Sequence, residues 1–217
     1  MQQQDGLAGY YARRADEYER IYEKPERQEY LAALRKLLLT LLADHDVLEI
    51  ACGTGYWTET IGLTARSIVA VDVNDAVLEI ARQKQYGTGN VRFTQADAYR
   101  LERVSRRFTA AFAGFWWSHI PLDRVAEFLS VLHARLQPGA LVVFCDNNYV
   151  EGSSTPIARA DAEGNTYQLR QLDDGSTHEV LKNFPTESRL RHAAAHVATD
   201  VHYVSLTHYW CLSYRLR

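Results

Sequence analysis

The stretch between residues 47 and 58, VLEIACGTGYWT, constrains the fold more than any other part of the chain. A short apolar run of strand length ends in small residues and two glycines, and a helix-like segment follows from residue 59 to residue 64. Gly53 and Gly55 let the backbone turn without a side chain in the way. A ligand can therefore lie against the main chain beside the partly positive N-terminus of the helix, and the pattern predicts a nucleotide-type ligand.

Two further predicted strands bring acidic side chains toward this loop. The apolar run 68–72 ends in Asp72, about 20 residues beyond the glycines, where a carboxylate can accept hydrogen bonds from both hydroxyls of a ribose. The run 91–95 is followed by Asp97, which is placed to meet the exocyclic amine of an adenine. A dinucleotide-binding loop would have a small residue where this chain has Thr58, so the two glycines alone are weak evidence.

Five motifs follow one another along the chain in a fixed order. They are the loop residues Glu49, Ala51, Cys52, Gly53, Thr54 and Gly55, then Asp72, then Asp97 with Ala98, then WSHIP at 117–121 and LQPGA at 136–140. Their order and spacing resemble the class I S-adenosylmethionine-dependent methyltransferases, in particular the small-molecule branch typified by ubiquinone- and menaquinone-biosynthesis enzymes. The resemblance covers roughly residues 10–148 and extends only loosely to the remainder.

The resemblance implies an α/β fold with a Rossmann-like, doubly wound seven-stranded sheet. This sheet is expected to be mostly parallel, with a C-terminal antiparallel hairpin and with helices on both faces. Local patterns agree, because 108–115 and 140–145 are apolar enough for buried parallel strands and 200–206 and 209–215 alternate like paired strands. We expect a single methyltransferase domain over 1–217, with lid helices in 1–43 and an inserted hairpin in 149–185 over the active site. A solvated hairpin without a role in the site is the alternative for the insertion.

S-adenosylmethionine is the cofactor that the resemblance implies, with S-adenosylhomocysteine as its product. The loop backbone is expected to contact the methionine part, Glu49 to hold the loop, Asp72 to bind the ribose, and Val73 and Ala98 to flank the adenine. Tyr11 and Tyr18 match a family pattern in which the first helix closes over the cofactor, and packing in the core is an equal alternative for them. The predicted cofactor-binding residues are Tyr11, Tyr18, Glu49, Ala51, Gly53, Gly55, Asp72, Val73, Asp97, Ala98 and Phe115.

The acceptor site is expected where strands 108–115 and 140–145 end, because ligands of open parallel sheets bind beyond the carboxyl ends of the strands. Trp116 and Trp117 offer flat apolar walls, suited to an organic acceptor or to packing against a helix. His119 is the candidate general base if the acceptor holds its proton tightly, and a purely structural histidine is the alternative. The predicted substrate-binding residues are Trp116, Trp117, Asn148 and Tyr149.

Charge and composition exclude some other classes of protein. A formal net charge of −3 argues against a nucleic-acid or anionic-membrane surface, which needs clustered cations. The sequence shows neither an apolar tract of membrane-spanning length nor a signal peptide, so a cytoplasmic protein is expected. The three cysteines lack metal-ligand spacing, and no metal site is expected. Cys52 is interpreted as a small packing residue rather than a nucleophile.

We therefore predict a cytoplasmic methyltransferase that moves a methyl group to an O, N, S or C atom of a small organic acceptor. A non-catalytic methyltransferase-like binding module and an enzyme that uses S-adenosylmethionine for a non-methylating reaction are the alternatives. A nicotinamide-dependent oxidoreductase is disfavoured by Thr58 and by the later motifs. The expected partner is the small-molecule acceptor, without nucleic acid or membrane. The oligomeric state stays open, with a homodimer as one option.

Overall fold

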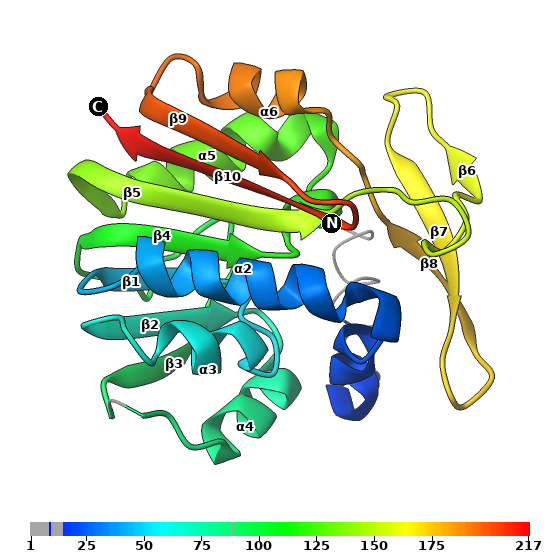
Figure 1. Cartoon of the computed structure of the whole chain (residues 1–217), viewed down its shortest axis with the longest axis horizontal. Coiled ribbons are helices and arrows are strands. Elements are labelled where there is room, and N and C mark those ends of the chain that lie inside the picture. The colour runs from blue at the N-terminus through cyan, green and yellow to red at the C-terminus, as the bar shows by residue number, and fades with distance from the viewer. Residues whose placement is uncertain (1–8, 10–14, 88) are drawn as a thin grey trace.

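Seven strands form the central sheet, in the order β3-β2-β1-β4-β5-β10-β9 (Figure 1). The computed structural model describes residue 9 and residues 15–87 and 89–217; for residues 15–18 it describes the backbone alone. The first five strands of that order pair in parallel, and β10 runs antiparallel to both β5 and β9. The predicted Rossmann-like sheet is thereby confirmed. The strands are β1 (Asp46–Ile50), β2 (Ser67–Asp72), β3 (Val91–Gln95), β4 (Phe108–Gly114), β5 (Leu136–Asn147), β9 (Ala198–Ser205) and β10 (Tyr209–Leu216).

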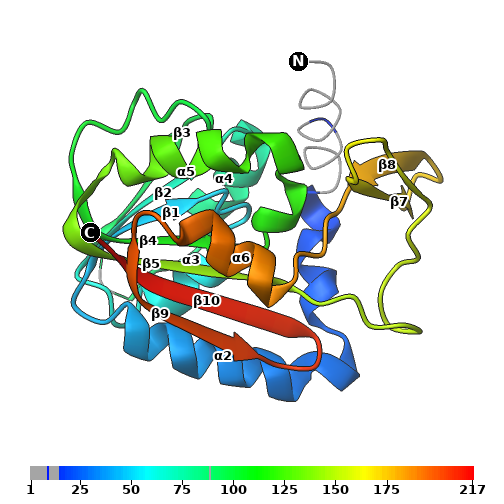
Figure 2. The ribbon, with the colours of Figure 1, turned by 90° about the horizontal axis from the view of Figure 1, so that it is seen from above.

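Helices cover both faces of this sheet because its central strands are apolar on both sides. In β1, Val47 belongs to one buried cluster with α2, α3 and α4, whereas its neighbour Leu48 belongs to the other cluster with α5 and α6. Figure 2 shows α2 and α5 on opposite sides of the strands. The helices are α2 (Gln28–Leu41), α3 (Tyr56–Ile61), α4 (Asp75–Gln83), α5 (Val125–His133) and α6 (Glu187–Ala194), with short 3-10 helices η1 (Ala15–Tyr22), η2 (Pro25–Arg27), η3 (Trp117–His119) and η4 (Leu122–Arg124).

The strand order changes direction between β1 and β4, which is where an open parallel sheet binds ligands. Val47 pairs with Ile68 of β2 on one side and with Ala110 of β4 on the other. The chain leaves β1 into the glycine loop and leaves β4 into η3. Both segments therefore lie at the same edge, beyond the carboxyl ends of the strands.

Two local expectations differ from the structure. Pro138 and Gly139, a pair typical of a turn before the expected strand 140–145, lie inside β5. Phe108 pairs with Leu136 and Ala110 pairs with Leu141, so the extra residues form an irregularity in one continuous strand. Among the lid helices expected in 1–43, the segment Ala15–Tyr22 is a 3-10 helix, η1. None of the described helices is both long and apolar enough to cross a membrane.

The insertion between β5 and α6 forms a second, three-stranded sheet. It consists of β6 (Arg159–Ala160), β7 (Thr166–Gln171) and β8 (Thr177–Leu181), in the order β6-β7-β8. Antiparallel pairing of β7 with β8 forms the expected hairpin, and β6 adds a short edge strand. Figure 1 shows this sheet standing beyond the ends of the parallel strands, next to η1 and η2.

Candidate active site

The glycine loop is held in a conformation that ordinary side chains rarely adopt. Ala51, Gly53 and Gly55 have φ angles of 52°, 55° and 79°. A Cβ atom at Gly55 would collide with the hydroxyl of Tyr86 and lie 3.2 Å from the Cβ of Ala81, so this position requires glycine. The loop backbone can therefore lie close to a ligand at the start of α3.

Asp72 connects the loop to the end of β2. Its Oδ2 accepts a hydrogen bond from the backbone N–H of Gly53 at 2.9 Å, and its Oδ1 accepts one from the N–H of Asn74 at 2.9 Å. Burial raises the pKa of Asp72, and these backbone donors oppose the shift. A carboxylate has about four lone-pair sites, so each oxygen keeps capacity for a further donor from a ligand.

The side chains of Glu49 and Cys52 are buried beneath the glycine loop, on its side toward the core. The side chain of Glu49 is 2% exposed, and its Oε2 accepts a hydrogen bond of 2.7 Å from the hydroxyl of Thr58. Burial raises the pKa of Glu49 to about 8, and the charge of Asp72 adds to the shift. Burial also raises the pKa of the Cys52 thiol, which keeps this residue protonated, as expected of a packing residue rather than a nucleophile.

We expect Glu49→Gln to flatten the pH dependence of stability in the ligand-free protein. Because the pKa of Glu49 rises from its ordinary 4.5 to about 8 on folding, between these values the unfolded chain loses a proton that the folded chain keeps. Stability therefore falls as the pH rises through this window, by about 1.4 kcal/mol for each pKa unit at most. Glutamine retains an acceptor for Thr58 and cannot ionise. Urea unfolding at pH 5 and pH 8 measures the slope, and Glu79→Gln on the exposed face of α4 is the control; equal slopes for Glu49→Gln and the wild type would contradict the assignment.

The other predicted cofactor residues are distributed along the same edge. Val73 follows Asp72 and is 51% exposed, whereas Ala98 after β3 is buried. Asp97 accepts a hydrogen bond of 2.9 Å from the N–H of Tyr99. Phe115, with φ of 60°, follows β4 and stacks on Trp57 at 5.7 Å between ring centroids. Tyr11 lies outside the described residues, and Tyr18 is described only as part of the η1 backbone.

The η1 segment lies against the glycine loop and the start of α3. Glu19 accepts a hydrogen bond of 2.7 Å from the hydroxyl of Thr54, and Trp57 donates one of 3.2 Å to the hydroxyl of Tyr22. The Tyr22 ring also stacks on Tyr56, with 3.8 Å between centroids. These contacts bring the N-terminal part of the chain next to the loop.

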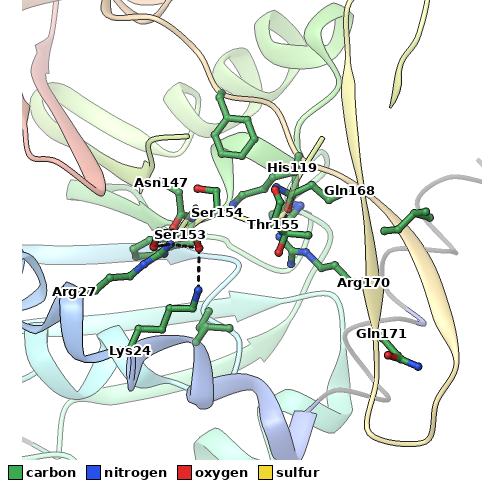
Figure 3. A pocket seen from close by; sticks show the side chains of 15 residues that line it. Lys24, Arg27, His119, Asn147, Ser153, Ser154, Thr155, Gln168, Arg170 and Gln171 are labelled. Carbon is green, nitrogen blue, oxygen red and sulfur yellow. Dashed lines mark hydrogen bonds between the residues drawn. The ribbon is translucent and has the colours of Figure 1, made fainter. Parts of the chain in front are cut away.

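A cavity of about 390 Å³ lies next to this edge (Figure 3). It lies between residues 15–27, which form η1 and η2 and are called the N-terminal segment, and the insertion. Three groups of residues line it: residues of η1, η2 and the turn between them, residues at the ends of the central strands, and residues of the insertion. Its volume is near the lower end of the range of about 300–1,000 Å³ typical of small-molecule sites. Its lining includes Lys24, Arg27, Phe115, His119, Asn147, Ser153, Thr155, Gln168, Arg170, Lys182 and Phe184.

His119 lines this cavity and is 6% exposed. Its Nδ1 lies 2.7 Å from the carbonyl oxygen of Leu181 in β8. Because a carbonyl oxygen only accepts, Nδ1 must carry the hydrogen, and Nε2 is then the nitrogen of the neutral ring that can take up a proton. The insertion therefore sets the tautomer that a general base needs.

A buried ion pair joins the insertion to η3, directly before His119. Lys182 Nζ lies 3.1 Å from Asp146 Oδ1 and donates a hydrogen bond of 2.6 Å to the hydroxyl of Ser118. Asp146 Oδ2 accepts a further bond of 2.8 Å from the N–H of Ser118. Burial lowers the pKa of Lys182 to about 8, opposed by the charge of Asp146. The pair ties β8, β5 and η3 together and thereby restrains the position of His119.

The four predicted substrate residues lie elsewhere. Trp117 is 5% exposed and packs in the core against Phe144 and Trp210, because the 3-10 turn of η3 directs its ring inward. The side chain of Trp116 packs between Tyr99 and Phe128. Within the described part of the chain, neither tryptophan lines the His119 cavity.

Asn148 and Tyr149 line a separate open depression of about 620 Å³ beside the turn between β9 and β10. The side-chain amide of Asn148 donates hydrogen bonds to the carbonyl oxygens of Leu206 at 2.7 Å and Tyr209 at 3.0 Å, which orders that turn. The ring of Tyr149 packs edge-on against Phe184 at 5.3 Å between centroids. The structure therefore gives Asn148 a role in joining the ends of strands, and it places neither residue among the described lining of the His119 cavity.

Sequence reasoning missed the cationic residues of the cavity, which are Lys24, Arg27, Arg170 and Lys182. They come from η2, the residue before it, β7 and the residue after β8, and no local spacing connects these segments. The one available signal was a pair of cations, Arg170 and Lys182, in the two strands of the expected hairpin. Among the described residues, no cluster of His, Cys, Asp or Glu could hold a metal ion.

Comparisons with known proteins agree with this arrangement. Residues 47–139 match the model of a family described as a methyltransferase domain. A demethylmenaquinone methyltransferase of Staphylococcus aureus (strain MRSA252) is 30% identical over 100 residues, which are 44% of this chain and 40% of that protein. The chain thus matches less than half the length of this curated relative.

Solved structures match over nearly the whole chain. The structure described as a DhpI-SAM-HEP complex is 26% identical with a TM-score of 0.80, over 98% of this chain and 97% of that chain. The amino pentose methyltransferase CalS10 from Micromonospora echinaspora, solved with SAM bound, is 18% identical with a TM-score of 0.62, over 93% of this chain and 96% of that chain. At this lower identity, the likeness to CalS10 concerns the fold alone.

Proposed function

We propose that the chain is a class I S-adenosylmethionine-dependent methyltransferase of the small-molecule type, which transfers a methyl group from S-adenosylmethionine to a small organic acceptor. The match of residues 47–139 to a methyltransferase-domain model and the likeness to methyltransferases over the rest of the chain support this proposal. One observation carries the proposal. Asp72 joins the end of β2 to the glycine loop at the same edge of the sheet at which His119 faces a cavity of small-molecule size. A nucleoside site and an acceptor site would therefore be neighbours, as transfer between two bound molecules requires.

The residues at the loop fit the cofactor. The two oxygens of Asp72 each keep acceptor capacity for ribose hydroxyls, and the exposed Val73 beside it offers an apolar contact for a base. The left-handed backbone at Ala51, Gly53 and Gly55 leaves the main chain open to the methionine part. When bound, S-adenosylmethionine supplies an electrophilic methyl group on a positively charged sulfur. Asp97, Ala98 and Phe115 stay in the proposed cofactor site.

The protein contributes orientation, proton transfer and exclusion of water. His119 would accept the acceptor's proton at Nε2 while its Nδ1–H donates to the carbonyl of Leu181, so the ring keeps one orientation during the reaction. Buried aromatic rings, among them Phe115 and Tyr209, surround the end of β4 and keep this region dry. An acceptor whose nucleophile is already deprotonated would need only the positioning.

We also propose that the N-terminal segment and the insertion enclose the acceptor, in keeping with the expected lid in 1–43 and inserted hairpin in 149–185 within one domain. Contacts between the two segments support this arrangement. Arg20 forms an ion pair of 2.7 Å with Asp173 at the tip of the hairpin, and Lys24 donates a hydrogen bond of 2.9 Å to the carbonyl of Ser153. The ion pair is exposed and contributes little stability, so the bonds to Ser153 are the stronger link between the two segments. The cytoplasmic location, the absence of nucleic-acid and membrane partners, and the homodimer stay predictions from the sequence.

Titration calorimetry with three ligands tests the proposed function. We expect S-adenosylmethionine and S-adenosylhomocysteine to bind with one saturable site and NAD not to bind. Binding of NAD alone would instead favour an oxidoreductase. If both sulfur ligands bind but no acceptor from a broad panel is methylated, the non-catalytic module or a non-methylating use of the cofactor becomes the better interpretation.

A further inference from the structure

The cavity beside His119 is lined by several cations from separate parts of the chain. Figure 3 shows Lys24 and Arg27 entering it from the N-terminal segment and Arg170 from the hairpin. Within the described residues, the lining includes no aspartate or glutamate. An excess of positive charge in a partly closed site is costly unless a counter-charge is bound there.

Arg27 is the residue that most needs such a counter-charge. It is 8% exposed, and its hydrogen-bond acceptors within the described part of the chain are neutral: the side-chain oxygen of Asn147 at 3.5 Å, and the carbonyl and hydroxyl oxygens of Ser153 at 3.1 and 3.0 Å. Its Nε is buried without a hydrogen-bond partner among the described residues. The neighbouring carboxylate, that of Glu26, accepts a bond of 3.1 Å from the Ser153 hydroxyl and forms no ion pair with Arg27. A buried guanidinium with an unpaired N–H therefore lies at the wall of the cavity.

The other cations strengthen the same demand. Lys182 already has a counter-charge in Asp146, 3.1 Å away on the side of η3. Even so, Arg170, Arg27 and Lys182 line the same cavity, and after burial the repulsion from the two guanidinium charges contributes to the lowered pKa of Lys182. A ligand with negative charge would relieve this repulsion, whereas a neutral or cationic ligand would leave it in place.

We propose that the acceptor carries a compact oxyanion, either a carboxylate or a phosphorus oxyanion, which Arg27 binds together with Lys24 and Arg170. The planar guanidinium donates two parallel hydrogen bonds to such a group, and this geometry would give Arg27 Nε a partner. His119 lines the same cavity, so the oxyanion would act as a handle that directs another atom of the acceptor toward the methyl donor. This inference rests on the proposed function, because it names the substrate class of the same site.

The test measures binding of simple oxyanions to the full chain, with and without saturating S-adenosylhomocysteine. Acetate and methylphosphonate are the probes, acetamide is the neutral control, and potassium chloride matches the ionic strength. We expect saturable binding of at least one oxyanion, no binding of acetamide, and a loss of about tenfold or more in oxyanion affinity for Arg27→Gln. Tighter binding of acetate would identify the group on the acceptor as a carboxylate, and tighter binding of methylphosphonate would identify it as a phosphorus oxyanion.

Arg159→Gln is the matched control, because Arg159 lies on the edge strand of the same insertion, paired with Glu179 outside the cavity. This variant should keep the wild-type oxyanion affinity. If Arg27→Gln does not fold, as its thermal unfolding curve would show, Lys24→Gln replaces it, since Lys24 is exposed and should cost threefold or so in affinity. Absence of saturable oxyanion binding, or equal affinity in the wild type and the lining variants, would overturn the inference. Binding of S-adenosylhomocysteine in that case would leave the proposed function standing, whereas oxyanion binding without it would leave only the anion site.

Discussion

Replacing Asp72 by alanine is expected to lower the affinity for S-adenosylmethionine by about 100-fold or more and to leave the protein folded. Each hydrogen bond from a ribose hydroxyl to an ionised carboxylate contributes about 1.5–3 kcal/mol, and two of them together account for at least two powers of ten in affinity. The same substitution removes the acceptor of the Gly53 N–H, so the loop also loses part of its preorganisation. The packing of the core is untouched because Asp72 ends its strand at the edge of the sheet.

Calorimetric titration measures this effect, and circular dichroism establishes that each variant is folded. Asp72→Asn separates the two contributions, since its amide oxygen can replace one acceptor while its NH₂ group repels the other N–H donor. Asp75→Ala is the matched control, because Asp75 lies on the exposed side of α4 and pairs with Arg82. An unchanged affinity for Asp72→Ala would remove Asp72 from the cofactor site.

Replacing His119 by alanine is expected to lower turnover by about 10²–10⁴-fold, the usual contribution of a positioned general base. The affinity for S-adenosylmethionine should change little, because the hydrogen bond that His119 forms with the described part of the chain joins its Nδ1 to Leu181 of the insertion. The rate of S-adenosylhomocysteine formation with an acceptor from the oxyanion class measures turnover.

His202→Ala serves as the control for removal of an imidazole, since His202 is exposed on β9. Addition of imidazole should restore part of the activity of His119→Ala if the ring transfers a proton. Wild-type turnover in His119→Ala would show that no histidine base operates, and the residue would then serve only to join η3 to β8.

The parts of the protein that the sequence predicted are those in which neighbouring residues carry the information. The two glycines, the apolar run before them and Asp72 lie within 26 residues of one another, and each acts through its own backbone or through an adjacent strand. The alternation of Val47 and Leu48 between the two faces of the sheet follows from the period of an extended strand. Such features do not depend on distant segments of the chain, so the fold and the turn at the glycines could be predicted from the sequence.

The lining of the His119 cavity was less predictable because its residues meet only after folding. Trp117 and His119 belong to one short turn, yet the turn sends the first into the core and the second to the cavity. The rotation of η3 about its own axis decides which of its side chains faces the core. A hydrophobic pattern of only three residues does not specify this rotation. The assignment of Trp117 to the substrate therefore rested on residue type, whereas its place depends on Phe144 and Trp210.

By itself, the sequence determined the apolar strands and the glycine loop followed by Asp72, because these depend on periodicity and on spacings of short range, and its ordered motifs carried the resemblance that implied a doubly wound sheet. Only the tertiary structure decided the charge of the His119 cavity. Arg27 and Ser153 are 126 residues apart and Asp146 and Lys182 are 36 residues apart, yet both pairs lie within hydrogen-bond distance. The net charge of a site depends on which side chains lie close together in space. Here those side chains come together only when the insertion and the N-terminal segment have folded against the ends of the strands.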